Sequence, residues 1–198
     1  HSLLTRWNPK LGVMRSWDFN KKWQFPVIID NMMNLEMLCY MSKHTGDRSF
    51  EKIARTHANT TIKNHFRKDY STYHVVSYDT ISGKPHAKNT HQGYADESAW
   101  ARGQAWGLYG YTMMYRETGK KAYLKQARAI ASFLVNHPNM PKDKVPYWDY
   151  NAPDIPNAKR DASAAAIMAS ALIELSQLDS SKDAARWLSF AQLQLRTL

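Results

Sequence analysis

Apolar and polar residues follow a helical spacing along most of the chain, and this pattern predicts pairs of helices. Residues 29–43 are apolar on most sides, so we expect a buried helix there. Thr45-Gly46 ends it, because glycine readily adopts the left-handed conformation found just past helix C-termini. Residues 49–66 carry one apolar stripe, which predicts a more polar helix with a single face on the core. The two segments together predict an inner helix followed by an outer helix.

The same order recurs twice along the chain. We expect an inner helix over 96–118 and an outer-type helix over 122–136. A proline-rich aromatic loop, VPYWDYNAPDIPN, follows them. Asp161 then precedes a helix rich in small residues, and a final helix is predicted from about Lys182 onward.

A weak internal repeat supports this order. Thr45-Gly46 and Thr118-Gly119 are each followed, at equal offsets, by an aromatic residue, an Ala-Arg pair, an alanine and a β-branched residue (Phe50 and Tyr123, Ala54-Arg55 and Ala127-Arg128, Ala58 and Ala131, Ile62 and Val135). The period of about 70 residues is too long for common solenoids. It suits helical hairpins arranged in a ring, so the predicted fold class is all-α, an α/α toroid, with residues 1–198 covering about half of it.

Short strands are predicted in the loops that would form one rim of the ring. Residues 13–18 alternate weakly, and residues 69–79 are rich in Tyr, Val and Thr, which favours a strand. We expect residues 81–89 to form a loop and residues 90–94 to return as the second strand of a long-looped hairpin.

The segment from Gly93 to Tyr115 contains three glycines in its helical part, and each costs roughly 1 kcal/mol relative to alanine. A helix packed closely against its neighbours explains that cost. Trp100 shares one face with two of the glycines, whereas Arg102 and Trp106 share another. This arrangement predicts a nearly buried helix whose aromatic and cationic end lines a cleft. The alternative is a core helix in which tryptophan only fills space.

Charge and composition narrow the possible functions little. The formal net charge is +10, and 43% of the residues are apolar. The positive charge suits either a polyanionic partner or a solvated outer surface. No apolar run is long enough to span a membrane, and the single Cys39 excludes an internal disulfide. Both ends of the sequence lack helix start and stop signals, so we expect a fragment.

Three aspartates precede predicted inner helices: Asp30, Asp96 and Asp161. We expect Asp96 and Asp161 to cap their helices, since both follow polar segments. Asp30 instead lies between Val-Ile-Ile and Asn-Met-Met. Burial there would raise the pKa of its carboxyl, and a helix N-terminus would lower it. Asp30 is therefore either a general acid or a structural cap or buried pair.

Six further residues are typical of sugar recognition: Trp17, His74, Gln92, Trp100, Arg102 and Trp106. Flat rings stack on pyranose faces, and the arginine fork pairs with a uronate carboxylate. The sequence contains no HExxH, no Cys or His cluster at metal spacing, no phosphate-binding loop and no nucleophile elbow. No metal or cofactor is predicted.

Four segments together resemble a known family: IIDNMMNLEML, YADESAWARGQAWGLYGY, PYWDYNAP and RDASAAAIMASALIEL. They are similar to the unsaturated glucuronyl hydrolases, glycoside hydrolase family 88. The resemblance implies an (α/α)6 barrel in the bacterial periplasm or cytoplasm. It implies as partner an oligosaccharide with a 4,5-unsaturated uronic acid at its non-reducing end. No cofactor, nucleic acid or membrane is implied, and the oligomeric state is left open.

The resemblance also implies roles for individual residues. Asp30 matches the general acid/base of the family, and Trp100 and Trp17 match aromatic walls of the cleft. The residues that match contacts to the unsaturated sugar are His74, Gln92, Arg102 and Trp106. A second essential aspartate of the family lies in a His-Asp motif, and no such motif occurs in residues 1–198.

Three alternatives remain open at this point. An unsaturated rhamnogalacturonyl hydrolase would share the fold, and only the WARGQAWG segment favours the glucuronyl type. A non-catalytic module that binds acidic polysaccharides would explain the absent second aspartate. Only the net charge favours a nucleic-acid-binding protein. The aromatic loops lack neighbouring runs of Lys or Arg, which argues against that function.

Overall fold

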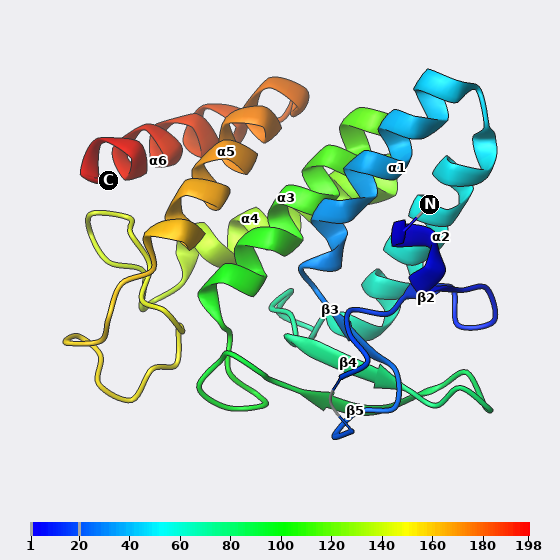
Figure 1. The fold of residues 1–198 in the computed structure, drawn as a ribbon. Helices are drawn as coiled ribbons and strands as arrows, with labels where there is room; N and C mark the ends of the chain where they lie inside the picture. The colour runs from blue at the N-terminus through cyan, green and yellow to red at the C-terminus, as the bar shows by residue number, and fades with distance from the viewer. Residues whose placement is uncertain (1, 20) are drawn as a thin grey trace.

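Three antiparallel helical hairpins form the body of the protein (Figure 1), as a computed structural model of residues 2–19 and 21–198 shows. The inner helices are α1 (Asn31–Thr45), α3 (Ala101–Thr118) and α5 (Ala162–Leu178), and the outer helices are α2 (Arg48–His65), α4 (Lys121–Asn136) and α6 (Ala184–Thr197). Each inner helix packs against the outer helix that follows it, and α3 also packs between α1 and α5. The predicted order of inner and outer helices is therefore confirmed.

The two predicted Thr-Gly stops end helices as expected. Gly46 and Gly119 follow α1 and α3 with φ angles of 77° and 66°, and their N–H groups donate to the carbonyls of Ser42 and Tyr115. Residues with a Cβ rarely adopt such angles. These two positions fix where each inner helix turns into its outer partner.

Close approach of α1 and α3 explains the glycines of α3. A Cβ added to Gly110 would lie 2.4 Å from the Cβ of Met32, and one added to Gly103 would lie 3.1 Å from a side-chain carbon of Ile29. Gly107 has more room, since its nearest neighbours would be 3.6 Å away. The predicted close packing is confirmed: Ile29, just before α1, lies against the first turn of α3, and Met32 of α1 lies against the middle of α3.

Short strands lie at one end of the helical layer, below α1 and α2 in Figure 1. The strands β1 (Trp7–Asn8) and β2 (Val13–Met14) pair with each other, preceded by a 3-10 turn, η1 (Ser2–Arg6). A second sheet has the order β3 (Pro26–Ile28), β4 (Val75–Tyr78) and β5 (Pro85–Asn89), all antiparallel. Ile28 pairs with Val75, and Val75 pairs with Asn89.

The strand predictions were correct only in part. The strand predicted over 13–18 covers two residues, and the one over 69–79 is limited to β4. The returning strand predicted at 90–94 is wrong, because 85–89 forms it and 90–94 forms a bent loop. Strand β3 was not predicted, since its apolar residues merge with the apolar start of α1.

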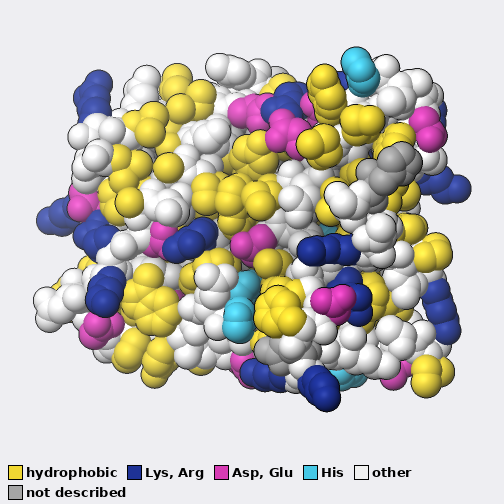
Figure 2. Space-filling model, in the orientation of Figure 1, with side chains coloured by type: hydrophobic (Ala, Val, Ile, Leu, Met, Phe, Trp, Pro, Cys, Tyr) yellow, Lys and Arg dark blue, Asp and Glu magenta, His cyan; other side chains and the backbone are white. Residues whose placement is uncertain are grey.

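The face formed by α1, α3 and α5 remains open in this structure. Figure 2 shows hydrophobic side chains across it, with acidic and basic side chains grouped near its upper edge. Met33, Met37 and Tyr40 of α1 are exposed there, the last two by 59% each. Arg116 lies at the C-terminal end of α3 and pairs with Glu36 and Glu174 of the neighbouring inner helices.

Candidate active site

Asp30 connects β3 to α1 and is the most unusual acid of the chain. It occupies the N-cap position, yet its side chain makes no capping hydrogen bond, and its backbone is already helical. The side chain is 16% exposed, and its Oδ2 atom has no hydrogen-bond partner among the described residues. Burial raises the pKa of Asp30 to about 6, whereas a backbone hydrogen bond and the charge of Arg102 oppose this shift. Asp30 is thus a poorly solvated carboxyl and not a cap.

His74 lies opposite Asp30 because the β3–β4 pairing places the end of one strand beside the start of the other. Its Nε2 is 3.8 Å from Asp30 Oδ2. Its Nδ1 accepts hydrogen bonds from the backbone N–H groups of His91 (3.1 Å) and Gln92 (3.2 Å). Burial lowers the pKa of His74 to about 3. The imidazole is therefore neutral and held rigidly beside the acid.

Trp100 and Arg102 complete this group from the start of α3. The Trp100 ring lies 4.3 Å from the His74 ring, tilted by 36°. The guanidinium of Arg102 lies 5.5 Å from the centre of the Trp100 ring. Since the charge of Arg102 also lowers the pKa of Asp30, the four predicted residues Asp30, His74, Trp100 and Arg102 form one cluster.

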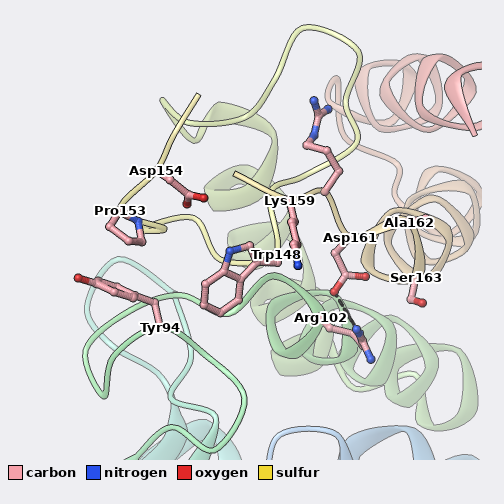
Figure 3. A pocket seen from close by; sticks show the side chains of 10 residues that line it. Tyr94, Arg102, Trp148, Pro153, Asp154, Lys159, Asp161, Ala162 and Ser163 are labelled. Atoms are coloured by element: carbon pink, nitrogen blue, oxygen red, sulfur yellow. Dashed lines mark hydrogen bonds and ion pairs between the residues drawn. The ribbon is translucent and has the colours of Figure 1, made fainter. Parts of the chain in front are cut away.

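A hollow of about 760 Å³ opens beside Arg102. Tyr94 and Trp148 contribute rings to its lining, and Lys159 and Ser163 contribute polar groups (Figure 3). Such a mixture of flat rings and hydrogen-bonding groups is typical of sugar-binding sites. The loop over 145–157, predicted to be rigid and aromatic, supplies Trp148 to this hollow.

Asp161 has two roles, of which the sequence indicated one. Its Oδ1 accepts the N–H of Ala164, which confirms it as the N-cap of α5. Its Oδ2 accepts from both Nε (3.2 Å) and Nη2 (3.0 Å) of Arg102, as the dashed line in Figure 3 indicates. The cap of one inner helix thereby orients the arginine of the previous one.

Asp96 is not an N-cap, so that prediction is wrong. Helix α3 begins at Ala101, with Trp100 at the N-cap position and no side-chain cap. The Asp96 carboxylate instead accepts the backbone N–H of Thr90 and the side-chain amide of Asn89, both at 2.8 Å. It holds the loop that delivers the two N–H groups to His74.

Asp149 was not predicted as a site residue from the sequence. It is fully buried, and its Oδ2 accepts the Tyr94 N–H (2.9 Å) and the Ser98 hydroxyl (2.6 Å). Its Oδ1 accepts the N–H of Asn151 two residues ahead, a local pattern that Asp often forms in turns. Asp149 therefore ties the loop before α3 to the loop before α5.

The remaining predicted residues, Trp17, Gln92 and Trp106, do not place their side chains in the cluster of Asp30, His74, Trp100 and Arg102. Trp17 packs near Trp23 and His91, with ring centres 5.7 Å and 5.4 Å away. Gln92 contacts the cluster through its backbone N–H, and its side chain is exposed. Trp106 lies one turn beyond Arg102 on α3, and lines a separate hollow of about 590 Å³ with Met33 and Tyr109.

Within residues 2–19 and 21–198, no three His, Cys, Asp or Glu side chains come together in a way that would bind a metal ion. In the same ranges, every helix is too short or too polar to cross a lipid bilayer.

Comparisons with known proteins identify relatives of the whole chain. An unsaturated glucuronyl hydrolase of Formosa agariphila is 56% identical over 198 residues, which are 100% of this chain and 49% of the relative. An unsaturated chondroitin disaccharide hydrolase of Streptococcus pneumoniae is 34% identical over 91% of this chain and 46% of its own length. The chain therefore spans about half the length of these relatives. No protein-family model matches it.

Solved structures agree with the sequence comparison. A crystal structure of an unsaturated glucuronyl hydrolase specific for heparin matches with a TM-score of 0.95 and 55% identity, over 99% of this chain and 52% of that one. A variant of the Streptococcus agalactiae enzyme complexed with dGlcA-GalNAc6S matches with a TM-score of 0.75 and 32% identity, over 86% of this chain and 45% of that one.

The helical hairpins and these matches define the class of the protein, which is about half of an (α/α)6 barrel with short strands in its loops. More specifically, the chain is a homologue of about half of an unsaturated glucuronyl hydrolase of glycoside hydrolase family 88.

Proposed function

We propose that this chain carries the acid/base group and part of the sugar-binding wall of an unsaturated glucuronyl hydrolase. The substrate would be an oligosaccharide with a 4,5-unsaturated uronic acid at its non-reducing end. The observation that carries this proposal is the buried carboxyl of Asp30, whose Oδ2 has no hydrogen-bond partner among the described residues and whose pKa of about 6 lies close to neutral pH. A general acid works best when its pKa is near the operating pH.

The proposed reaction is the hydration of a vinyl ether. Asp30 gives its proton to C4 of the C4=C5 double bond, and positive charge develops at C5 and on the ring oxygen. Water then adds to C5 while the Asp30 carboxylate takes one of its protons, which restores the acid. The resulting hemiketal opens, and the bond to the rest of the oligosaccharide breaks. This route differs from ordinary glycoside hydrolysis, where two carboxyl groups flank the acetal.

The other members of the cluster would bind and orient the sugar. Arg102 uses two of its donors on one oxygen of Asp161, so its remaining N–H groups are directed away from that contact and can pair with the uronate carboxylate. Trp100 offers an aromatic surface beside His74. The low exposure of Asp30 and His74 limits the access of bulk water to the acid, so the water that reacts would have to enter with the bound substrate.

The proposed substrate class is a glycosaminoglycan fragment left by a polysaccharide lyase. Relatives of this chain are named for unsaturated chondroitin disaccharides and for heparin, and one relative is complexed with an unsaturated sulfated disaccharide. The formal charge of +10 suits such anionic fragments.

The test uses a full-length chimera in which residues 1–198 replace the matching segment of the Formosa agariphila relative, since that relative matches the whole chain. Loss of the ultraviolet absorbance of the double bond measures turnover of unsaturated heparin and chondroitin disaccharides. We expect Asp30→Asn to lower kcat by at least about 100-fold, the lower range for general acid catalysis. Normal turnover by folded Asp30→Asn would refute the assignment.

Asp47→Asn is the matched control. Asp47 caps the outer helix α2 by accepting the N–H of Ser49. Its replacement also changes an aspartate at the start of a helix, but this helix start is not part of the cluster around Asp30. We expect a small loss of stability, because the helix loses its cap, and unchanged turnover.

A further inference from the structure

The carboxyl of Asp30 and the imidazole of His74 present two unpaired atoms to each other. Asp30 Oδ2 and His74 Nε2 are both buried, and neither has a hydrogen-bond partner in the described part of the chain. They lie 3.8 Å apart, which is about 1 Å too long for a hydrogen bond. Buried polar groups without partners are rare and call for an explanation. A small movement on substrate binding would close this gap.

The hydrogen bonds at Nδ1, on the side of the ring away from Asp30, decide which nitrogen of His74 carries the proton. Nδ1 faces two backbone N–H donors, those of His91 and Gln92. A nitrogen that accepts two hydrogen bonds carries a lone pair and no proton, so the proton of the neutral ring must be on Nε2. The doubly protonated ring is excluded for the same reason, because it would direct an N–H at two other N–H groups.

The two donors belong to a tight loop whose shape depends on a distant carboxylate. Asp96 Oδ1 accepts the N–H of Thr90, and its Oδ2 accepts the side-chain amide of Asn89. The Thr90 hydroxyl in turn accepts the N–H of Gly93. The loop is thus held on both sides of the residues that donate to His74. Asp96 itself is exposed and does not contact the ring.

We infer that Asp96 is a positioning residue that holds His74 in the Nε2–H tautomer, so that a fixed N–H donor faces the Asp30 carboxyl. This inference rests on the proposed role of Asp30 as acid/base. His74 then cannot act as a base toward the substrate, because its Nε2 has no lone pair to offer. The Nε2–H group of His74 stabilises the carboxylate form of Asp30 after proton transfer. Because this group faces Oδ2, the acidic proton is carried by Oδ1.

The surroundings of His74 leave the loop as the determinant of the tautomer. Trp100 covers one face of the ring, with 4.3 Å between the two ring centres. The charged or titratable groups that act on it are Asp30, His91 and His65. Asp30 favours an N–H on Nε2, whereas protonation of either histidine would repel a proton from His74. None of them opposes the tautomer that the loop imposes.

The experiment measures the tautomer directly. The chimera is labelled with ¹⁵N-histidine, and the ring nitrogens of His74 are assigned by the signals that vanish in His74→Gln. We expect one protonated and one unprotonated nitrogen, with the proton on Nε2. Asp96→Ala should mix in the Nδ1–H form and lower kcat/KM about tenfold, as expected for one lost hydrogen bond to a charged group. Asp96→Asn, which keeps an acceptor for Thr90, should recover part of both effects.

Glu97→Gln is the matched control. Glu97 neighbours Asp96 and contacts Arg67 and Tyr73 instead of the 89–93 loop, so the spectrum and kcat/KM should not change. An unaltered His74 spectrum in folded Asp96→Ala, or an Nδ1–H form in the parent protein, would overturn the inference. Failure of the acid/base role is distinguishable, since it would appear as an active Asp30→Asn variant whatever the tautomer of His74.

Discussion

Arg102 and Asp161 form an ion pair of 3.0 Å between two successive inner helices, and the same carboxylate caps the second of them. Asp161 is buried, whereas the side chain of Arg102 is 38% exposed and borders the hollow of Figure 3. One residue therefore links the stability of α5 to the position of the guanidinium.

Replacement of Arg102 by lysine should raise KM for unsaturated disaccharides in the chimera. Lysine keeps the charge but lacks the planar fork, so it cannot pair with Asp161 and a uronate carboxylate at once. We expect an increase of roughly tenfold, with kcat less affected, because hydrogen bonds to charged groups contribute about 1.5–3 kcal/mol. Steady-state kinetics give both constants, and an unchanged KM would remove Arg102 from the binding site.

Asp161→Ala should lower both stability and substrate affinity. Loss of the cap should cost about 1–2 kcal/mol of unfolding free energy, and the released guanidinium should raise KM. Asp47→Ala, which removes a cap without an arginine partner, should lower stability alone. In the double variant with Arg102→Lys, the two effects on KM should not add, because both remove the same contact. Additive effects would show that Asp161 acts on α5 only.

The raised pKa of Asp30 predicts an unusual dependence of stability on pH. The folded protein keeps the Asp30 proton up to about pH 6, whereas the unfolded chain loses it near pH 3.8. The folded state therefore binds more protons between these values, and its stability falls as pH rises through this window. At pH 8, Asp30→Asn should be more stable than the parent by up to about 3 kcal/mol. At pH 3.5 the two should be equal.

Chemical denaturation of both proteins at the two pH values provides the measurement. Only the difference between variant and parent is interpreted, because other groups titrate equally in both. A variant that is equally stable or less stable at pH 8 would mean that the carboxylate of Asp30 is well solvated in the folded protein.

The glycines of α3 give a prediction about packing. Gly110→Ala should destabilise the protein by about 1–3 kcal/mol, the usual cost of overpacking, because the new Cβ would fall 2.4 Å from that of Met32. Gly107→Ala is the matched control on the same helix, since its Cβ would meet nothing closer than 3.6 Å. It should be neutral or stabilising by up to about 1 kcal/mol. Thermal melts that rank the two variants in the opposite order would contradict this packing.

The helices were predictable because each is apolar on one face or on most sides, and because α1 and α3 end at a Thr-Gly signal. The start of α3 was not predictable in this way. Asp96, Glu97 and Ser98 have the composition of a first helical turn, yet Asp149 binds the Tyr94 N–H and the Ser98 hydroxyl and holds this segment as a loop. A contact between residues about 50 positions apart thus overrides a local preference.

For the strands and the site, too, residue types could be predicted from the sequence, whereas the arrangement depends on contacts between distant residues. Strand β5 has the sequence PHAKN, with little β propensity, and it forms because β4 offers it an edge. The types of residue in the site were evident from the sequence and the family resemblance. Their arrangement was not, because the contact between Asp30 and His74 depends on the pairing of β3 with β4.

That pairing makes the geometry of the acid and the imidazole independent of the length of the adjoining hairpin. Ile28 pairs with Val75, just before Asp30 and just after His74, whereas the hairpin turn at 79–84 lies at the far end of β4, with Ile81 80% exposed. A one-residue change within β4 would turn His74 to the opposite side of the sheet. The turn, in contrast, is a point where evolution or an engineer can insert a peptide tag or a reporter domain without disturbing the chemistry.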